Sequence, residues 1–416
     1  MNIPVKTDFN EYDLNKRICI YQGNGKFLIT GDIIHNDNIE IYYNFPNSPS
    51  IEFITSEVIT SEKFVDYDLY SFSIDLIQTD NNLMGCISGT GHSFNKANNT
   101  IDYLDGQIKE ISSVTIEDVD RLEFCLLNCS SAGESKNEAI FFQTEDWEIS
   151  LQPIQNKNEN KTKVSQSFSV THSGSIIRKD RKIFDPDDAE KVIKGLEWLL
   201  SLLNEKVVEI PMFFGYLSEE KLFERYLSVN TESNEYKRVW LNIEEHFTDL
   251  LPEVVEKLDD EIWGGVFGQL LEWYIELNHG RLIENQIITV QVALELISWN
   301  YLVIEKEKID KSSFKSTWKS DVFRMLFEEF KISNHFNDFN LHSELNNYNG
   351  DGAYILTDVR NNIIHPDKKQ VFSKDAYYTV LSFGISCLQS ALLYLLNYKG
   401  KYKSKYSYIF RNVSQN

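Results

Sequence analysis

The segment that could carry chemistry is Thr357-Asp358-Val359-Arg360-Asn361-Asn362-Ile363-Ile364-His365-Pro366. Proline disfavours helical backbone at the residue before it, so a helix through this segment should end at His365. The negative end of the helix dipole lies there and favours a protonated imidazole. A histidine that holds or releases a proton near neutral pH, close to the permanent charge of Arg360, suits acid–base chemistry on a phosphodiester.

These side chains fall on defined faces of the expected helix, which turns by about 100° per residue. Asp358, Asn361 and His365 share one face, and Arg360 lies at its edge, so only the long arginine side chain can reach across. The opposite face should pack in the core, and it carries Leu356, Val359 and Ile363. Because the polar face points away from that core, an enclosed site would need a second surface, which we expect to be the same face of another copy. The same spacing also fits a salt-bridged helix end with ordinary packing.

At these residues the chain resembles a known family. The stretch from Arg360 to His365 matches the R-x4-6-H motif of HEPN ribonucleases, including the polar residue, here Asn361, directly after the arginine. A β-rich N-terminal region followed by helices and a C-terminal motif is similar to the ApeA-type HEPN proteins of bacterial antiphage defence. The likeness in architecture covers nearly the whole chain, and the resemblance is stronger for residues 281–416, which carry the motif, than for residues 1–180.

The resemblance implies a metal-independent endoribonuclease that uses no cofactor. Arginine and histidine from two protomers of a homodimer would form a composite site. Arg360 would stabilise charge on the scissile phosphate, His365 would act as general acid or base during attack of the 2′-hydroxyl, and Asn361 would position the phosphate or the imidazole. The product would be a 2′,3′-cyclic phosphate, and the cleavage would serve as the toxic step of abortive infection, set off by a phage-derived trigger at the β domain. The alternative is a non-catalytic HEPN module that binds a nucleotide or a partner.

Further side chains could support this site. Asp358 shares the motif face, and Glu295 is the only charged residue between Asn285 and Ile304, so it could orient Arg360 from a neighbouring helix or simply face solvent. Residues 366–416 contain 8 basic and 2 acidic side chains, whereas residues 217–310 contain 8 basic and 20 acidic ones. The basic side chains could attract the RNA backbone, or they could be an ordinary solvated chain end. Those that we expect to bind RNA are Lys368, Lys369, Lys399 and Lys401.

The elements that must position the motif fall into two classes, which predict an α+β protein. Up to about residue 180 apolar and polar residues alternate, as in Trp147, Ile149 and Leu151, which favours a β-rich sandwich or barrel that acts as a sensing domain. Asp185-Pro186 is typical of a helix start. We therefore expect a helical connector over residues 181–280 and an all-α, HEPN-type bundle over residues 281–416. The expected helices cover residues 217–229, 236–248, 252–278, 284–305, 316–331, 351–365 and 373–398.

Composition and charge limit the class of protein further. The chain has 416 residues, a formal charge of −22 and 42% hydrophobic residues, which excludes wholesale disorder and makes nucleic-acid binding depend on a local basic patch. The first 17 residues contain charges and no apolar run, so we expect no secretory signal. Five cysteines are few and odd in number, which favours reduced thiols and a cytoplasmic location.

One uncharged stretch, residues 377–398, is long enough to cross a bilayer. Its serine, threonine, glutamine and asparagine side chains favour a buried bundle helix instead. A membrane-tethered signalling protein is the alternative that this stretch leaves open, and we expect no membrane association.

Overall fold

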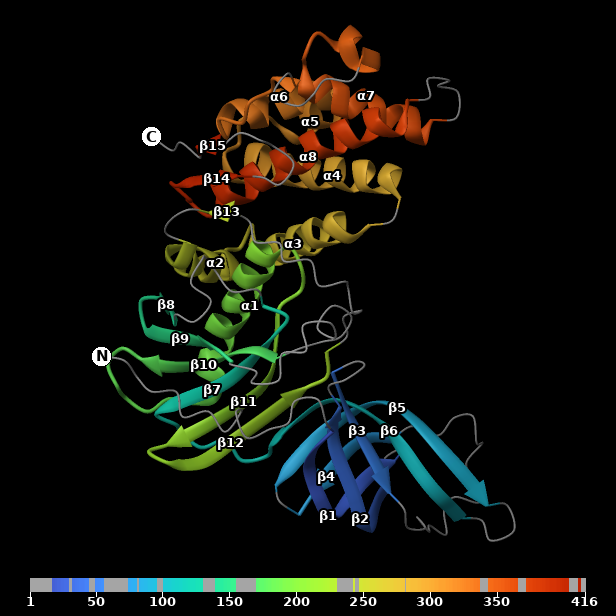
Figure 1. Ribbon diagram of the computed structural model, residues 1–416, viewed down its shortest axis with the longest axis vertical. Helices are drawn as coiled ribbons and strands as arrows, with labels where there is room; N and C mark the ends of the chain where they lie inside the picture. Colours follow the sequence, from blue (N-terminus) through green and yellow to red (C-terminus); the bar gives the residue numbers. More distant parts are fainter. Residues whose placement is uncertain are drawn as a thin grey trace. The chain divides into compact units, whose positions relative to one another are not determined.

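The structure is a computed structural model of the chain (Figure 1). The chain divides into two compact units, one made of residues 1–193 and 208–238 and the other of residues 194–207 and 239–416. The protein is α+β as predicted, with the strands of its large sheet in the first unit and the helical bundle in the second. The structure describes residues 17–29, 32–44, 49–55, 74–80, 82–95, 100–129, 139–154, 170–229, 242–243, 247–280, 282–336, 343–365, 372–403 and 411–412.

The first unit begins with a closed antiparallel barrel. Its six strands pair in the order β3-β2-β1-β4-β5-β6, and pairing of β3 with β6 closes the ring. The interior is filled by side chains with no exposed surface, among them Phe27, Ile41, Phe53, Ile77 and Ile108. The strands are β1 (Ile18–Ile29), β2 (Asp32–Asn44), β3 (Ser50–Thr55), β4 (Ile74–Thr79), β5 (Leu83–Asn95) and β6 (Thr100–Ser113).

The same sheet continues beyond the barrel as an open array. The last residues of β6 pair with β12, with Ser112 opposite Arg225, and the order then runs β12-β11-β7-β10-β9-β8. The strand predicted around Trp147 is confirmed as β9, in which Trp147, Ile149 and Leu151 are buried, but Ser150 on the opposite face is buried too. The strands are β7 (Arg121–Leu127), β8 (Ile140–Gln143), β9 (Trp147–Pro153), β10 (Val170–Arg178), β11 (Glu209–Leu217) and β12 (Glu220–Leu227).

The prediction of a helix over residues 217–229 is wrong. Leu222, Phe223, Tyr226 and Leu227 recur at spacings that a helix would also place on one face, but they form β12. Pairing with β11 buries Phe223 and Tyr226, so tertiary pairing outweighs the local pattern. The chain thus returns to the first unit after residue 208, beyond the boundary expected at residue 180.

The helix start predicted at Asp185-Pro186 is confirmed. The Asp185 carboxylate accepts a hydrogen bond from the Asp187 N–H at 2.9 Å and caps η3 (Pro186–Ala189), which leads into α1 (Glu190–Asn204). The apolar stripe of α1 is buried, and it consists of Val192, Ile193, Leu196, Leu199, Leu200 and Leu203.

The second unit contains α1 from residue 194 onward, the remaining helices and a small sheet of β13 (Asn242–Ile243), β14 (Lys401–Lys403) and β15 (Arg411–Asn412). The long helix expected over residues 252–278 is two helices. The helix expected over 236–248 is wrong at residues 242–243, which pair with β14 as a strand, and most of its other residues lie outside the described ones. The helices predicted from residue 284 onward are confirmed. The helical elements are η4 (Phe247–Asp249), α2 (Leu250–Asp259), α3 (Gly264–His279), α4 (Ile283–Ser298), the π-helix η5 (Trp299–Glu305), α5 (Lys311–Ser316), α6 (Lys319–Glu329), η7 (Ser343–Tyr348), α7 (Gly352–Ile364) and α8 (Lys374–Leu395).

The two most apolar helices lie at the centre of this unit. In the described part of the chain, residues 283–305 and α8 are long and apolar enough to cross a membrane, yet 61% and 78% of their most apolar windows are buried. They pack closely, because a Cβ added at Gly384 in α8 would lie 2.6 Å from Val290 Cγ1 in α4. The interpretation of residues 377–398 as a buried bundle helix agrees with this packing.

Candidate functional site

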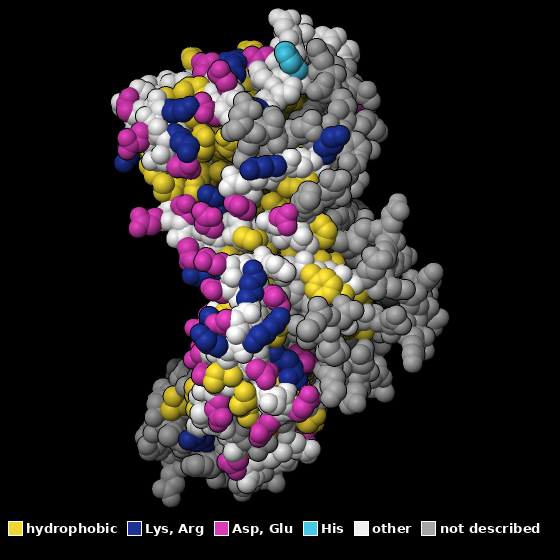
Figure 2. All heavy atoms as spheres, turned by 90° about the vertical axis from the view of Figure 1, so that its left-hand side faces the viewer, with side chains coloured by type: hydrophobic (Ala, Val, Ile, Leu, Met, Phe, Trp, Pro, Cys, Tyr) yellow, Lys and Arg dark blue, Asp and Glu magenta, His cyan; other side chains and the backbone are white. Residues whose placement is uncertain are grey.

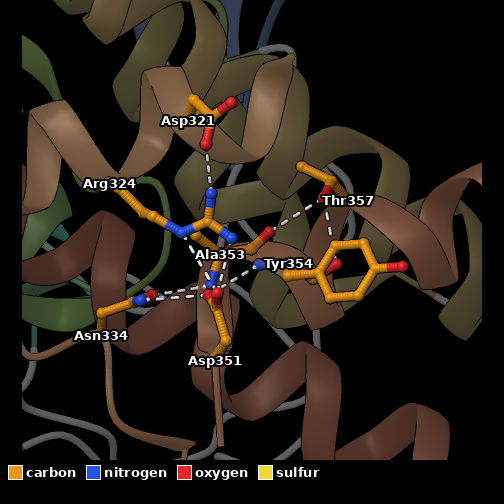
Figure 3. Close-up of polar contacts among 7 residues, drawn as sticks. All are labelled: Asp321, Arg324, Asn334, Asp351, Ala353, Tyr354 and Thr357. Carbon is orange, nitrogen blue, oxygen red and sulfur yellow. Dashed lines mark hydrogen bonds and ion pairs between the residues drawn. The ribbon is translucent and has the colours of Figure 1, made fainter. Parts of the chain in front are cut away.

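The candidate site lies on α7, whose first turn is held by a polar network (Figure 3). Asp351 is its N-cap, and its Oδ1 accepts hydrogen bonds from the Tyr354 N–H at 3.1 Å and from Asn334 Nδ2 at 3.0 Å. Arg324 of α6 donates to Asp351 Oδ2 from Nη2 at 2.5 Å and from Nε at 3.1 Å, and it also pairs with Asp321. Burial raises the pKa of Asp351, but the hydrogen bonds from Arg324, Asn334 and Tyr354 outweigh burial and lower that pKa overall.

Asn334 completes the cap from the segment that follows α6. Its Oδ1 accepts the Ala353 N–H at 2.7 Å, and its main-chain carbonyl accepts the Gly352 N–H at 2.9 Å. Three amides that a helix start leaves without intrahelical partners are therefore satisfied by Asn334 and Asp351. Gly352 also lies against α8, where an added Cβ would be 2.1 Å from Phe383 Cζ. The start and the rotation of α7 are set by these contacts, and so are the directions of its side chains.

The far end of α7 is the predicted motif. His365 is the C-cap, with extended backbone (φ −104°, ψ 111°), and its N–H donates to the Asn361 carbonyl at 3.1 Å. The helix ends where Pro366 predicted that it would, and the His365 side chain is exposed. The imidazole is thus accessible to a ligand.

Arg360 and Asn361 contact each other one turn before His365. Arg360 is half-buried, and its Nη1 donates to Asn361 Oδ1 at 3.2 Å, so the guanidinium does reach towards the polar face. Its Nε is buried and has no hydrogen-bond partner among the described residues. Of the predicted core face, Leu356 and Val359 have no exposed surface, whereas Ile363 near the end of the helix is only partly buried.

Asp358 has structural partners that the sequence did not reveal. Its Oδ2 accepts hydrogen bonds from the Tyr348 hydroxyl at 2.7 Å and from Asn362 Nδ2 at 3.2 Å. Burial and the bond to this carboxylate raise the pKa of Tyr348 well above its usual range, so the hydroxyl stays a donor. Asp358 therefore joins η7 to the motif helix. Tyr348 lies ten residues away at the end of the short 3-10 helix η7, where the sequence carries no signal of the contact.

The contact expected between Glu295 and Arg360 is not found among the described residues. Glu295 Oε1 instead lies 2.7 Å from Lys319 Nζ at the start of α6, and both side chains are about one-third exposed. The reason is that the face of α4 that carries Glu295 is turned to the first residue of α6. The interpretation of Glu295 as a solvent-facing carboxylate fits this geometry.

Two of the lysines expected to bind RNA, Lys399 and Lys401, are described, and they lie apart from the motif. Both are exposed and follow the C-terminal end of α8, a helix of about 33 Å, whereas His365 precedes the N-terminal end of α8 in the chain (Figure 1). Lys368 and Lys369 lie outside the described residues. On the face drawn in Figure 2, acidic and basic side chains of the described residues are interspersed.

These features define an α+β protein with a β-barrel and sheet unit and a helical unit that carries an arginine–histidine motif at a helix end. Residues 98–239 match the model of the YopA central domain, and residues 260–415, a range that contains Arg360 and His365 of this chain, match the model of the YopA C-terminal domain. The chain is similar to the SPbeta prophage-derived uncharacterized protein YopA of Bacillus subtilis (strain 168), with 27% identity over 431 residues that cover 97% of this chain and 95% of the relative. No solved structure matches. The names of the two matched domains and of the relative state no activity.

Proposed function

We propose that this protein is a HEPN-type, metal-independent endoribonuclease whose site is formed by Arg360, Asn361 and His365. The observation that carries the proposal is the exposed imidazole of His365 at the end of α7, about one helical turn after the hydrogen-bonded pair of Arg360 and Asn361. A proton-transfer group and a fixed positive charge on one accessible surface are what phosphodiester cleavage without a metal requires.

The proposed reaction is an internal transfer. A base removes the proton of the 2′-hydroxyl, the 2′-oxygen bonds to phosphorus, and the bond from phosphorus to the 5′-oxygen breaks. An acid protonates the departing 5′-oxygen, which leaves a 2′,3′-cyclic phosphate and a 5′-hydroxyl. The guanidinium of Arg360 stabilises the charge that grows on the non-bridging oxygens.

The need for both an acid and a base supports a homodimer. The motif supplies one histidine per chain, and a two-fold axis through the motif face of α7 brings a second one to the same phosphate. The imidazole is exposed in the single chain, so a second copy would also exclude water from the site.

The experiment is cleavage of a fluorescent single-stranded RNA by the purified protein in EDTA. We expect Arg360→Ala and His365→Ala each to lower the rate by at least about 100-fold. The matched control is His335→Ala, which removes another exposed histidine and should leave the rate unchanged. Retained cleavage in either motif variant would refute these roles, and wild-type protein that binds RNA or a nucleotide without cleaving it would favour the non-catalytic HEPN module.

Mixing equal amounts of wild type and His365→Ala tests the composite site. If both histidines of a dimer serve one phosphate, random exchange of subunits leaves activity only in the quarter of dimers that are wild type in both chains. If each chain acts on its own, half of the wild-type activity remains.

In the cell we propose that this cleavage acts in the cytoplasm as the toxic step of antiphage defence, restrained or triggered through the β unit. Expression of the wild-type chain should then arrest growth and fragment cellular RNA. Expression of His365→Ala at equal abundance should do neither, and growth arrest by that variant would refute RNA cleavage as the cause.

A further inference from the structure

The motif face of α7 begins with an exposed aromatic ring. Tyr354 lies 4, 7 and 11 residues before Asp358, Asn361 and His365, which places the four side chains within about 60° of one another around the helix. Tyr354 is 47% exposed, although its neighbour Ile355 is fully buried. A large ring in line with the proposed cleavage site is therefore open to a ligand.

The ring of Tyr354 is held in place. It meets the ring of Tyr348 at a centroid distance of 5.5 Å and an angle of 62°, an edge-to-face contact. Tyr348 is only 8% exposed and is itself fixed by its bond to Asp358, while the Tyr354 N–H is fixed by Asp351. A ring held in this way loses little freedom when a flat ligand stacks on it.

The spacing along the helix fits a strand that also reaches the motif. At about 1.5 Å per residue, Tyr354 lies about 9 Å from Arg360 and about 17 Å from His365 along the axis. The longer distance equals about five nucleotides of stacked strand, at a rise of about 3.4 Å each, and fewer if the strand is extended.

A negative charge lies between Tyr354 and Arg360, so this part of the motif face should contact the bases of an RNA strand and not its phosphates. The Asp358 carboxylate lies between Tyr354 and the motif, and it would repel a phosphate, although Tyr348 and Asn362 satisfy its Oδ2. A strand held at Arg360 should therefore turn its bases, not its backbone, towards the first turns of α7.

We propose that Tyr354 stacks on an unpaired base of the RNA to one side of the scissile phosphate and makes the site selective for single-stranded RNA. The inference rests on the proposed function and extends it to the class of substrate. Any base can stack on an aromatic ring, so this contact would distinguish single-stranded from double-stranded RNA but would not distinguish one sequence from another.

The experiment measures binding in the His365→Ala background, where RNA stays intact, by fluorescence anisotropy with a labelled 12-nucleotide single strand. We expect Tyr354→Ala to weaken binding by about 5- to 150-fold, Tyr354→Leu to weaken it nearly as much, and Tyr354→Phe to keep it within about twofold. Binding of a duplex of the same length should change by less than about twofold in all three. The matched control is Tyr378→Ala, which removes a tyrosine of similar exposure (50%) from α8 and should leave binding unchanged.

A second measurement locates the contact. Irradiation of a strand that carries 5-iodouridine should crosslink it to Tyr354, and mass spectrometry of the digested complex identifies the attached residue. Unchanged binding by Tyr354→Ala, or equal losses for Tyr354→Ala and Tyr354→Phe, would overturn the proposal. A loss that follows dissociation of the dimer, seen by light scattering, would assign Tyr354 to an interface between copies instead.

The outcomes separate this inference from the proposed function. Cleavage by the wild type together with unchanged binding by Tyr354→Ala refutes stacking alone. A wild type that does not cleave, but whose binding depends on the ring of Tyr354, refutes the nuclease and leaves stacking in place. A wild type that binds no RNA refutes both.

Discussion

Replacing Asp351 by alanine should loosen the start of the motif helix. The substitution removes the N-cap bond from the Tyr354 N–H, worth about 1 kcal/mol, and the bond from Asn334, worth about 1 kcal/mol. Arg324 keeps 38% of its side chain exposed, so we assign its ion pair no more than about 0.5 kcal/mol. The expected loss in free energy of unfolding of the second unit is about 2 kcal/mol, or about 4 to 8 °C in its melting temperature.

The same arginine supplies a matched control. Asp321 also pairs with Arg324, three residues away on α6, but it is half-exposed and caps no helix. Asp321→Ala should cost no more than about 0.5 kcal/mol. Urea unfolding measures both losses, and hydrogen exchange should show faster exchange at the amides of Ala353 and Tyr354 in Asp351→Ala only. Equal losses in the two variants would refute the assignment of Asp351 as the residue that holds α7.

The pH dependence of the free energy of unfolding is a second test of the role of Asp351. The pKa of Asp351 is lower in the folded chain than its ordinary value of 3.8. A carboxyl group of this kind stabilises the fold above the pKa of the unfolded chain, and the stabilisation is lost as the pH falls through the folded pKa. The difference in stability between the wild type and Asp351→Asn should therefore be full at pH 7 and shrink below about pH 4. A difference that grows on acidification would contradict this sign.

Three further outcomes are expected. Gly352→Ala should destabilise the second unit by about 1 to 3 kcal/mol, because the new Cβ would meet Phe383, and Phe383→Leu should restore part of the loss in a thermal melt. Tyr348→Phe should cost about 1 to 2 kcal/mol in urea unfolding, because the hydroxyl bond to a carboxylate is lost. Glu295→Ala should change stability by less than about 1 kcal/mol and RNA cleavage by less than about twofold, since its partner is Lys319 and not the motif.

The ends of the motif helix could be predicted because the signals are local. Pro366 marked the end at His365, and the apolar spacing marked the face that carries Leu356 and Val359, both of which are buried. An aspartate just before an apolar run is also typical of a helix start, and it could have identified Asp351 as the cap.

The partners of the site could not be predicted, because they come from distant parts of the chain. Arg324 and Asn334 precede Asp351 by 27 and 17 residues, and only the packing of α6 against α7 brings them together. The error at β12 has a similar origin. Its amphipathic pattern fits two periods, and the neighbouring strand β11 decides between them.

Strand β6 belongs to two structures at once, because it closes the barrel through β3 and β5 and also begins the open array through β12. The segment that matches the YopA central domain starts at residue 98, just before β6. A protein shortened to start there would keep the strand and lose its barrel partners, which leaves a row of unpaired amides and carbonyls along a 14-residue edge. Such an edge recruits strands from other molecules, so this truncation should aggregate, whereas the intact first unit keeps β6 paired with β3 and β5.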